Sequence, residues 1–392
     1  MRMKRLLTIL IMVLALIKAN GQIAANDSWQ HEYEGEIPIY IDSIQAQLTY
    51  PLAFRNYQDA ATWRETAREK VFECMGPPPP LPEKWDMEVL AEEQRDGYIA
   101  QCIAFNLSRW YRVKAYLLIP TRYKNSRPSP LAPRPAIVLL HDHGAHLSIG
   151  KEKMIRPFAV DSTVINDADA WVENLYEGQY LGDYLAKNGY VVFSIDAPLW
   201  GERGRKEGAD RKKYDIIAGN MMMLGGDLCA YMHYDDLRSV DFLASLPFVD
   251  TSRIGAAGCS MGAYRTWMLA ALSDKIAVGC ADCWMVTTKA QLTTRYGRKE
   301  NGGFANCIPG LRRWMDYPDI ASLAAPKPML FINGKRDKLF PVAGVEKAYE
   351  IMHDVWDAFG ISANLETYLL EQGHECNKEN QGMILDFFNH NL

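Results

Sequence analysis

The feature that most constrains this chain is the pentapeptide Gly-Cys-Ser-Met-Gly at residues 258–262. It stands directly between a predicted strand, 253–257, and a predicted helix, 264–272. Small residues on both sides of the serine allow the sharp strand-to-helix turn that lifts a hydroxyl above the edge of a sheet. The five-residue pattern alone often arises by chance. In this setting it favours an exposed nucleophile at Ser260 over a serine that only caps the helix.

The segments around this turn alternate between short apolar runs and helical patterns. We expect strands at 136–140, 190–195, 253–257, 276–281, 329–332 and 366–370, helices at 181–188, 235–246, 264–272, 344–359 and 381–389, and an antiparallel pair at 98–107 and 111–119. This order predicts an α/β fold with a mostly parallel central sheet and helices on both faces. Two segments, 147–180 and 201–234, are longer than ordinary connections and are expected to be lids or binding loops.

Residues 1–21 place basic residues before an apolar run at 6–17 and small residues at positions 19 and 21. This is the pattern of a cleaved secretory signal. We therefore expect an exported protein, periplasmic or extracellular, with no stable membrane insertion after cleavage; an uncleaved membrane anchor is the alternative. The signal holds four basic residues and no acidic one, so its removal takes the formal net charge from −5 to −9. A nucleic-acid partner is accordingly not expected.

The next segment, 22–85, is predicted to be an N-terminal helical extension. A helix is expected over 57–73, where apolar residues recur at helical spacing. The prolines at 77–80 then end this helix and form a stiff connector. The catalytic domain is expected to span 86–392.

A serine hydroxyl becomes a nucleophile only beside a base that an acid holds in place. Asp337 follows the predicted strand 329–332, and His374 follows the predicted strand 366–370. The carboxyl ends of parallel strands meet at one edge of a sheet, so both side chains are expected beside Ser260. We therefore predict a Ser260–His374–Asp337 triad that works through an acyl-enzyme.

Acyl transfer also needs N–H donors for the developing oxyanion. One donor is expected to be the backbone N–H of Met261, at the start of the helix that follows the serine. The other is expected from His143 or Gly144, in the loop after the strand 136–140.

Two clusters have the residue types of metal sites. The loop 141–146 contains three histidines and an aspartate, and Cys280 and Cys283 form a Cys-x-x-Cys pair. The loop, however, is where the second oxyanion donor is needed, and no second Cys-x-x-Cys accompanies the pair. We therefore expect neither a metal nor a cofactor.

Several motifs together carry a family resemblance. They are His-Asp-His-Gly at 141–144, Asp-Ala-Pro-Leu-Trp-Gly-Glu-Arg at 196–203, the pentapeptide at 258–262, Asp337, and Gly-His at 373–374. With these motifs the chain, from about Trp63 onward, resembles the dienelactone hydrolase and acetyl xylan esterase branch of the α/β hydrolases. That branch includes secreted bacterial carbohydrate esterases of the pectin methylesterase and glucuronoyl esterase kinds. The resemblance implies an α/β-hydrolase fold with lid insertions and the activity of a serine carboxylic-ester hydrolase.

The resemblance also bears on the cysteines. In glucuronoyl esterases a cysteine before the catalytic serine is bridged to one beside the catalytic histidine, which makes Cys259 and Cys376 candidates for a disulfide. Here the second cysteine lies two residues beyond His374, and Met261 stands where those enzymes carry an arginine. Dienelactone hydrolases proper use a cysteine nucleophile, whereas this chain has Ser260.

Positive charge and tryptophans gather in segments that we expect at the rim of the site. Basic residues cluster at 203–213 and again at 295–313. A guanidinium pairs well with a uronate carboxylate. Arg203 is the predicted carboxylate contact, Trp200, Trp284 and His141 are further predicted substrate contacts, and Trp171 is another candidate platform. The alternative is a solvated basic face above tryptophans that belong to the core.

Export, the triad and the basic rim together predict an esterase whose substrate is a polysaccharide or oligosaccharide ester of the plant cell wall. Methyl esters of pectin uronates are the leading case, and acetyl and glucuronoyl esters are the alternatives. A serine peptidase could use the same triad, although 22–85 is too short for the extra domain of prolyl-oligopeptidase-type peptidases. A carbohydrate-binding module without activity would require a broken triad.

Overall fold

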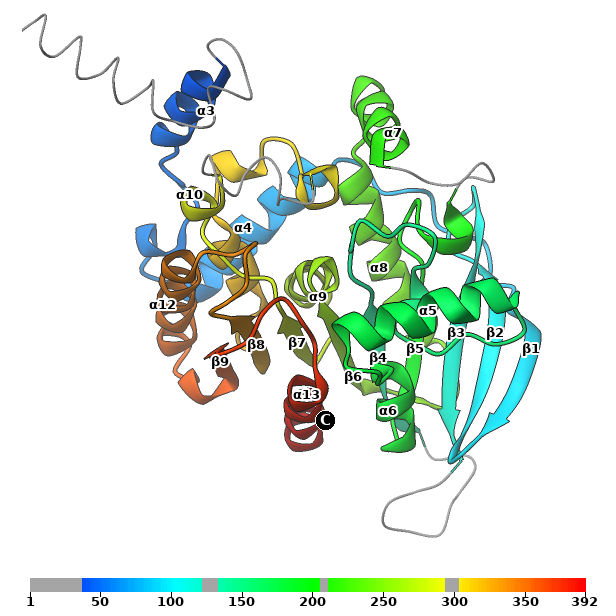
Figure 1. The fold of residues 1–392 in the computed structure, drawn as a ribbon. Helices are drawn as coiled ribbons and strands as arrows, with labels where there is room; N and C mark the ends of the chain where they lie inside the picture. Colours follow the sequence, from blue (N-terminus) through cyan, green and yellow to red (C-terminus); the bar gives the residue numbers. More distant parts are fainter. Residues whose placement is uncertain (1–36, 122–132, 205–210, 293–302) are drawn as a thin grey trace, which may run out of the picture.

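Nine strands form one sheet in the order β1-β2-β3-β5-β4-β6-β7-β8-β9 (Figure 1). The computed structural model describes residues 37–121, 133–204, 211–292 and 303–392. The strands are β1 (Glu88–Arg95), β2 (Tyr98–Asn106), β3 (Arg112–Pro120), β4 (Arg134–Leu140), β5 (Val191–Ile195), β6 (Val249–Cys259), β7 (Val278–Asp282), β8 (Met329–Gly334) and β9 (Leu365–Leu370). Neighbouring strands from β5 to β9 in this order are parallel, so their C-terminal ends share one edge of the sheet.

Helices cover both faces of this sheet (Figure 1). They are α3 (Ile37–Ala46), α4 (Ala60–Met75), α5 (Ser162–Leu175), α6 (Leu181–Lys187), α7 (Arg211–Met223), α8 (Leu228–Ala244), α9 (Met261–Leu272), α10 (Thr288–Gln291), α11 (Tyr317–Ala321), α12 (Val342–Ala358) and α13 (Lys378–Asn391). One hydrophobic core includes side chains from α4, α8, α9, α11 and α12, and a second includes side chains from α5, α6 and α13. The predicted α/β fold is confirmed.

The segments 147–180 and 201–234, predicted to be lids or binding loops, contain α5, α7 and the first part of α8. One strand differs from the sequence-based expectation. The edge strand β1 was not predicted, since it reads Glu-Val-Leu-Ala-Glu-Glu-Gln-Arg and has no buried residue. Backbone pairing with β2 holds this segment in an extended strand, although its own hydrophobic pattern does not predict one.

The segment before β1 packs into the main core. Trp63, Ala67 and Val71 of α4 are fully buried and belong to the same cluster as α9 and the sheet. The helix predicted over 57–73 is therefore present, two to three residues later than expected, and is part of the core. The proposed signal lies outside the described residues, and among the described helices none is long and apolar enough to cross a bilayer.

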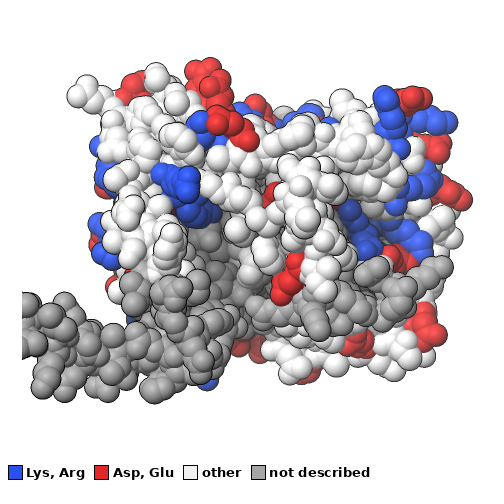
Figure 2. Space-filling view, turned by 90° about the horizontal axis from the view of Figure 1, so that it is seen from above, with Lys and Arg blue, Asp and Glu red and all other residues white. Residues whose placement is uncertain are grey.

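The shared C-terminal edge of the strands faces the viewer in Figure 2. Its described part shows basic and acidic side chains interspersed around the periphery, while the centre is largely uncharged. Most of the residues predicted to form a basic rim lie outside the described residues and side chains, so the basic rim stays a prediction.

Candidate active site

The turn between β6 and α9 has the geometry that the pentapeptide predicts. Ser260 has φ +56° and ψ −122°, a conformation that non-glycine residues rarely adopt and that is typical of functional turns. Glycine is required at positions 258 and 262 because a side chain would clash with the neighbouring backbone. A Cβ at Gly262 would lie 1.8 Å from the carbonyl oxygen of Leu140, and one at Gly258 would lie 2.4 Å from the same oxygen. The backbone of the turn is thus packed directly against the end of β4.

The predicted acid and base lie at the ends of the adjacent strands β8 and β9. The Nδ1 of His374 is 2.7 Å from the Oδ2 of Asp337, and the backbone N–H of Leu339 donates to the Oδ1 of the same carboxylate over 2.8 Å. Burial lowers the pKa of His374, but the hydrogen bond and charge of Asp337 outweigh it and hold the pKa above its ordinary 6.5. The imidazole is therefore oriented and its protonated form is stabilised, as a general base requires.

A second carboxylate lies behind this pair. Asp282, at the end of β7, is fully buried, and its backbone carbonyl accepts a hydrogen bond of 2.8 Å from the N–H of Ser260. The Nδ2 of Asn380 donates to both of its carboxylate oxygens. Burial raises the pKa of Asp282 to about 6. Sequence reasoning missed this residue because an aspartate at a strand end has no distinctive local pattern.

The predicted disulfide between Cys259 and Cys376 is not present, since both cysteines are free thiols. The two side chains are fully buried. The Sγ of Cys283, which is also buried, donates to the Oδ1 of Asp282 over 3.4 Å. Burial contributes to raising the pKa of the Cys259, Cys283 and Cys376 thiols. The Cys283 thiol is therefore kept protonated as a donor to the carboxylate.

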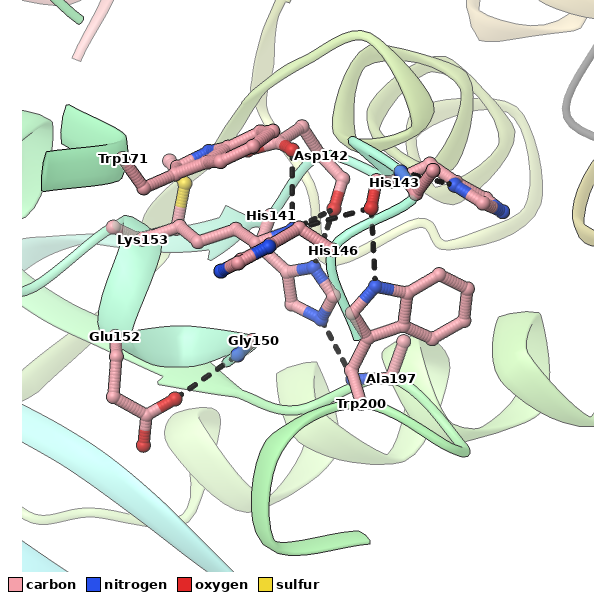
Figure 3. Close-up of polar contacts among 12 residues, drawn as sticks. His141, Asp142, His143, His146, Gly150, Glu152, Lys153, Trp171, Ala197 and Trp200 are labelled. Carbon is pink, nitrogen blue, oxygen red and sulfur yellow. Dashed lines mark hydrogen bonds and ion pairs between the residues drawn. The ribbon is translucent and has the colours of Figure 1, made fainter. Parts of the chain in front are cut away.

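The loop after β4 is held from below by side chains (Figure 3). The Nδ1 of His141 lies 2.8 Å from the carbonyl oxygen of Asp142, and its Nε2 accepts a hydrogen bond of 2.9 Å from the N–H of Ala197. His141 is 0% exposed, and burial holds its pKa well below the ordinary value. The ring is thus a neutral link between the ends of β4 and β5. The prediction that it touches substrate is corrected, because no part of it reaches the surface.

Lys153 lies under the same loop and is also fully buried (Figure 3). Its Nζ is 3.2 Å from the carbonyl oxygen of Asp142, from the Oδ1 of Asp142 and from the carbonyl oxygen of His143. The other carboxylate oxygen, Oδ2, accepts hydrogen bonds from the Tyr176 hydroxyl, at 2.9 Å, and from the Nε1 of Trp171, at 3.2 Å. Nothing in the sequence singles out this lysine.

Two of the predicted substrate contacts, Trp200 and Trp284, are part of the packed interior. Trp200 is 0% exposed and Trp284 is 2% exposed. The Nε1 of Trp200 donates to the carbonyl oxygen of His143 over 3.2 Å, and Trp284 packs among Tyr264 and Tyr317. Trp171 is partly buried, and its ring stacks on that of His146. Trp200 and Trp284 fill space in the interior, so their predicted role as substrate contacts is corrected, whereas the role of the partly exposed Trp171 as a platform stays a prediction.

Arg203 is likewise occupied. Its Nη2 lies 2.7 Å from the Oδ2 of Asp235, its Nη1 donates to the carbonyl oxygen of Asp196, and its guanidinium lies over the ring of Tyr111. Its side chain is 16% exposed. The prediction that Arg203 pairs with a substrate carboxylate is corrected, because an internal carboxylate already holds it. Other predicted basic residues lie outside the described parts of the chain: residues 205, 206, 295, 298 and 299, and the side chains of 211–213.

Three groups of potential metal ligands converge among the described residues, and two of them share Cys283. Glu152, Asp196 and Glu202 lie close together, but all three bind the ammonium of Lys151, at 2.6, 3.0 and 3.0 Å. In the other two, around the triad, the Sγ of Cys283 lies within 4.8 Å of Asp282 and Cys259, and within 4.8 Å of ligand atoms of Asp337 and His374. Hydrogen bonds within the protein already use several of these atoms.

Comparison with known proteins agrees with this geometry. The Abhydrolase_7 model, an abhydrolase family, matches residues 34–388. YtaP of Bacillus subtilis, assigned as a hydrolase, is 28% identical over 314 residues, which cover 79% of this chain and 94% of YtaP.

Solved structures share the fold. A Bacteroides fragilis protein assigned as an acetyl xylan esterase superposes with a TM-score of 0.66 at 18% identity, covering 84% of this chain and 81% of its own. The methylesterase BT1017 gives 0.62 at 18% identity, with coverage of 88% and 68%. A glucuronoyl esterase from Solibacter usitatus gives 0.59 at 15% identity, with coverage of 88% and 99%. The chain has the α/β-hydrolase fold that the sequence resemblance implied, and it belongs to the Abhydrolase_7 family of hydrolases.

Proposed function

We propose that this protein is a serine ester hydrolase in which Ser260 is the nucleophile, His374 the general base and Asp337 the orienting acid. The observation that carries the proposal is the 2.7 Å contact between the partly exposed His374 and the buried Asp337, at the same edge of the sheet as the strained serine turn. A turn of this kind is costly unless it presents a reactive side chain.

The reaction follows from this arrangement. His374 takes the proton of Ser260 as the hydroxyl oxygen attacks the ester carbonyl, and the backbone N–H of Met261 and an N–H of the loop at His143 or Gly144 stabilise the oxyanion. The imidazolium then protonates the leaving alcohol. Water, activated by the same histidine, hydrolyses the acyl-enzyme and restores the serine.

For the substrate we favour methyl esters of uronic acids in plant cell-wall polysaccharide, with acetyl and glucuronoyl esters as alternatives. In the leading case the acyl group on Ser260 is a uronoyl unit and methanol leaves first. The structural neighbours, an assigned acetyl xylan esterase, a methylesterase and a glucuronoyl esterase, support a carbohydrate ester in general. Met261 in place of an arginine favours a substrate other than a glucuronoyl ester.

A tryptophan that the sequence reading passed over supports an extended glycan. Trp110 is 63% exposed in the turn between β2 and β3. β3 pairs antiparallel with β5, with Ala115 opposite Ile195, so this turn lies at the same edge as the triad. Trp110 and the exposed Arg109 line a depression of about 480 Å³, and no described carboxylate lies within ion-pair distance of Arg109. An exposed indole beside an unpaired guanidinium suits a sugar ring that carries a carboxylate.

The test is product release from methyl-esterified and from acetylated pectin fragments, with the wild-type protein beside Ser260→Ala. We expect methanol from the wild type and a loss of kcat on the order of 10⁴–10⁶-fold in the variant. Acetate without methanol would overturn the methyl-ester assignment and keep the mechanism. Ester hydrolysis by Ser260→Ala within tenfold of wild type would overturn the mechanism itself.

We also propose that the protein is exported after cleavage of residues 1–21. The sequence of this segment supports the proposal. Mass determination of the protein secreted by its natural host is expected to place the mature N-terminus at Gln22, and a full-length chain in the membrane fraction would contradict it.

A further inference from the structure

The loop that follows β4 is fixed by an unusual contact: a buried lysine that donates to two consecutive backbone carbonyls. An ammonium has three donor protons, and the Nζ of Lys153 has three oxygens at 3.2 Å, two of them the carbonyl oxygens of Asp142 and His143. The third is the Asp142 carboxylate, which balances the charge. The hydrogen-bonding capacity of this ammonium is thus used up inside the protein.

Holding a carbonyl also fixes the N–H of the next residue. In a planar trans peptide the C=O and N–H point in opposite directions. Because the carbonyls of Asp142 and His143 both point to Lys153, the N–H groups of His143 and Gly144 point away from it. Those are the two N–H groups predicted, from the sequence, as candidates for the second oxyanion donor.

The loop needs such a restraint. Gly144 has φ +59°, and a Cβ there would lie 2.3 Å from the ring of Trp171. The following residue, Ala145, also has a positive φ, +52°. Peptides next to such residues have alternative orientations of similar energy, and a flipped peptide would present a carbonyl oxygen where a donor is required. Lys153 opposes that flip for two peptides at once.

We propose that Lys153 is a positioning residue of the active site, which holds the two peptides of the 142–144 segment so that their N–H groups face the oxyanion. The inference rests on the ester hydrolysis proposed above and adds a specific residue to it. Lys153 does not touch the substrate, and it acts only through the backbone of the loop. Its effect is therefore expected in the transition state, where the oxyanion forms, and not in substrate binding.

The test compares Lys153→Met with a matched control, Lys327→Met. Lys327 is a partly buried lysine that also donates to two backbone carbonyls, those of Ala270 and Ser273, but at the far end of α9. For hydrolysis of a small chromogenic acetyl ester, we expect Lys153→Met to lower kcat about 10²-fold with KM within twofold, as for loss of an oxyanion donor. Lys327→Met should lower the melting temperature while leaving kcat within twofold.

A boronic acid gives a second readout, because it binds the serine as a tetrahedral adduct with an oxygen in the oxyanion position. Its inhibition constant is expected to rise in Lys153→Met by about the same factor as kcat falls. If Lys153→Met does not fold, Lys153→Gln is measured instead; because its amide keeps two donor protons for the carbonyls, kcat is expected to fall less than 10²-fold, again with KM within twofold.

Three results decide the matter. Equal losses of kcat in the two lysine variants, or a large change in KM with unchanged boronate inhibition, would overturn the positioning role. Loss of kcat accompanied by a shifted pH limb of His374 would also overturn it, since Lys153 would then act through charge. A wild-type protein without ester hydrolysis would refute the proposed function instead, which separates the two failures.

Discussion

The two loops that meet at the candidate site are stabilised in different ways. The nucleophile turn after β6 is held by backbone packing, with Gly258 and Gly262 pressed against the carbonyl of Leu140. The loop after β4 is held by side chains that are distant in sequence, Lys153 and Trp200. The first geometry is encoded within five residues, whereas the second depends on residues about ten and nearly sixty positions away. A motif therefore identifies the nucleophile but not the groups that aim the second oxyanion donor.

The largest effect is expected on the nucleophile side, from Asp337→Asn. The substitution keeps the shape but removes the charge and the acceptor that orient His374, so kcat should fall on the order of 10⁴-fold. Since His374 must be neutral to act and Asp337 holds its pKa above 6.5, wild-type activity should rise with pH through a limb above 6.5. In the variant, burial without the opposing carboxylate should move that limb to lower pH. An unmoved limb in the pH profile would contradict the assignment of the acid.

The tight backbone packing of the nucleophile turn is tested by Gly262→Ala. The added Cβ would lie 1.8 Å from a backbone oxygen, which no side-chain movement can relieve. We expect a loss of unfolding free energy of about 3 kcal/mol or more, measured by denaturant titration. Gly382→Ala is a control on α13, where a Cβ would meet nothing within 4 Å. A variant as stable as this control would show that the turn is looser than described.

The contribution of side chains to the other loop is tested by Trp200→Phe, which keeps an aromatic ring but removes the N–H that donates to the His143 carbonyl, together with one ring of a fully buried side chain. One neutral hydrogen bond contributes about 1 kcal/mol. We therefore expect kcat to fall about fivefold with KM unchanged, a smaller effect than that of Lys153→Met. If kcat does not change, Lys153 and the backbone N–H of His146 are sufficient to hold that carbonyl. A fall equal to that of Lys153→Met would mean that both donors are indispensable.

The same contrast explains what the sequence could and could not predict. The parallel sheet and the positions of Ser260, Asp337 and His374 follow from strand patterns and the turn that succeeds each strand. The substrate contacts could not be predicted in this way, because the sequence of a charged segment does not distinguish a buried tryptophan or arginine from an exposed one. Trp200 and Arg203 have internal partners, while the exposed Trp110 has no sequence signal beyond its place in a hairpin.

The measurement that tests the central claim most directly is the site of covalent labelling by a fluorophosphonate, which reacts with a serine only when a working base and oxyanion hole activate it. Peptide mass spectrometry of the labelled wild-type protein is expected to show one adduct, on the peptide that contains Ser260, and greatly slowed labelling in Asp337→Asn. A labelled residue other than Ser260, or no labelling of a folded wild-type protein, would contradict the account.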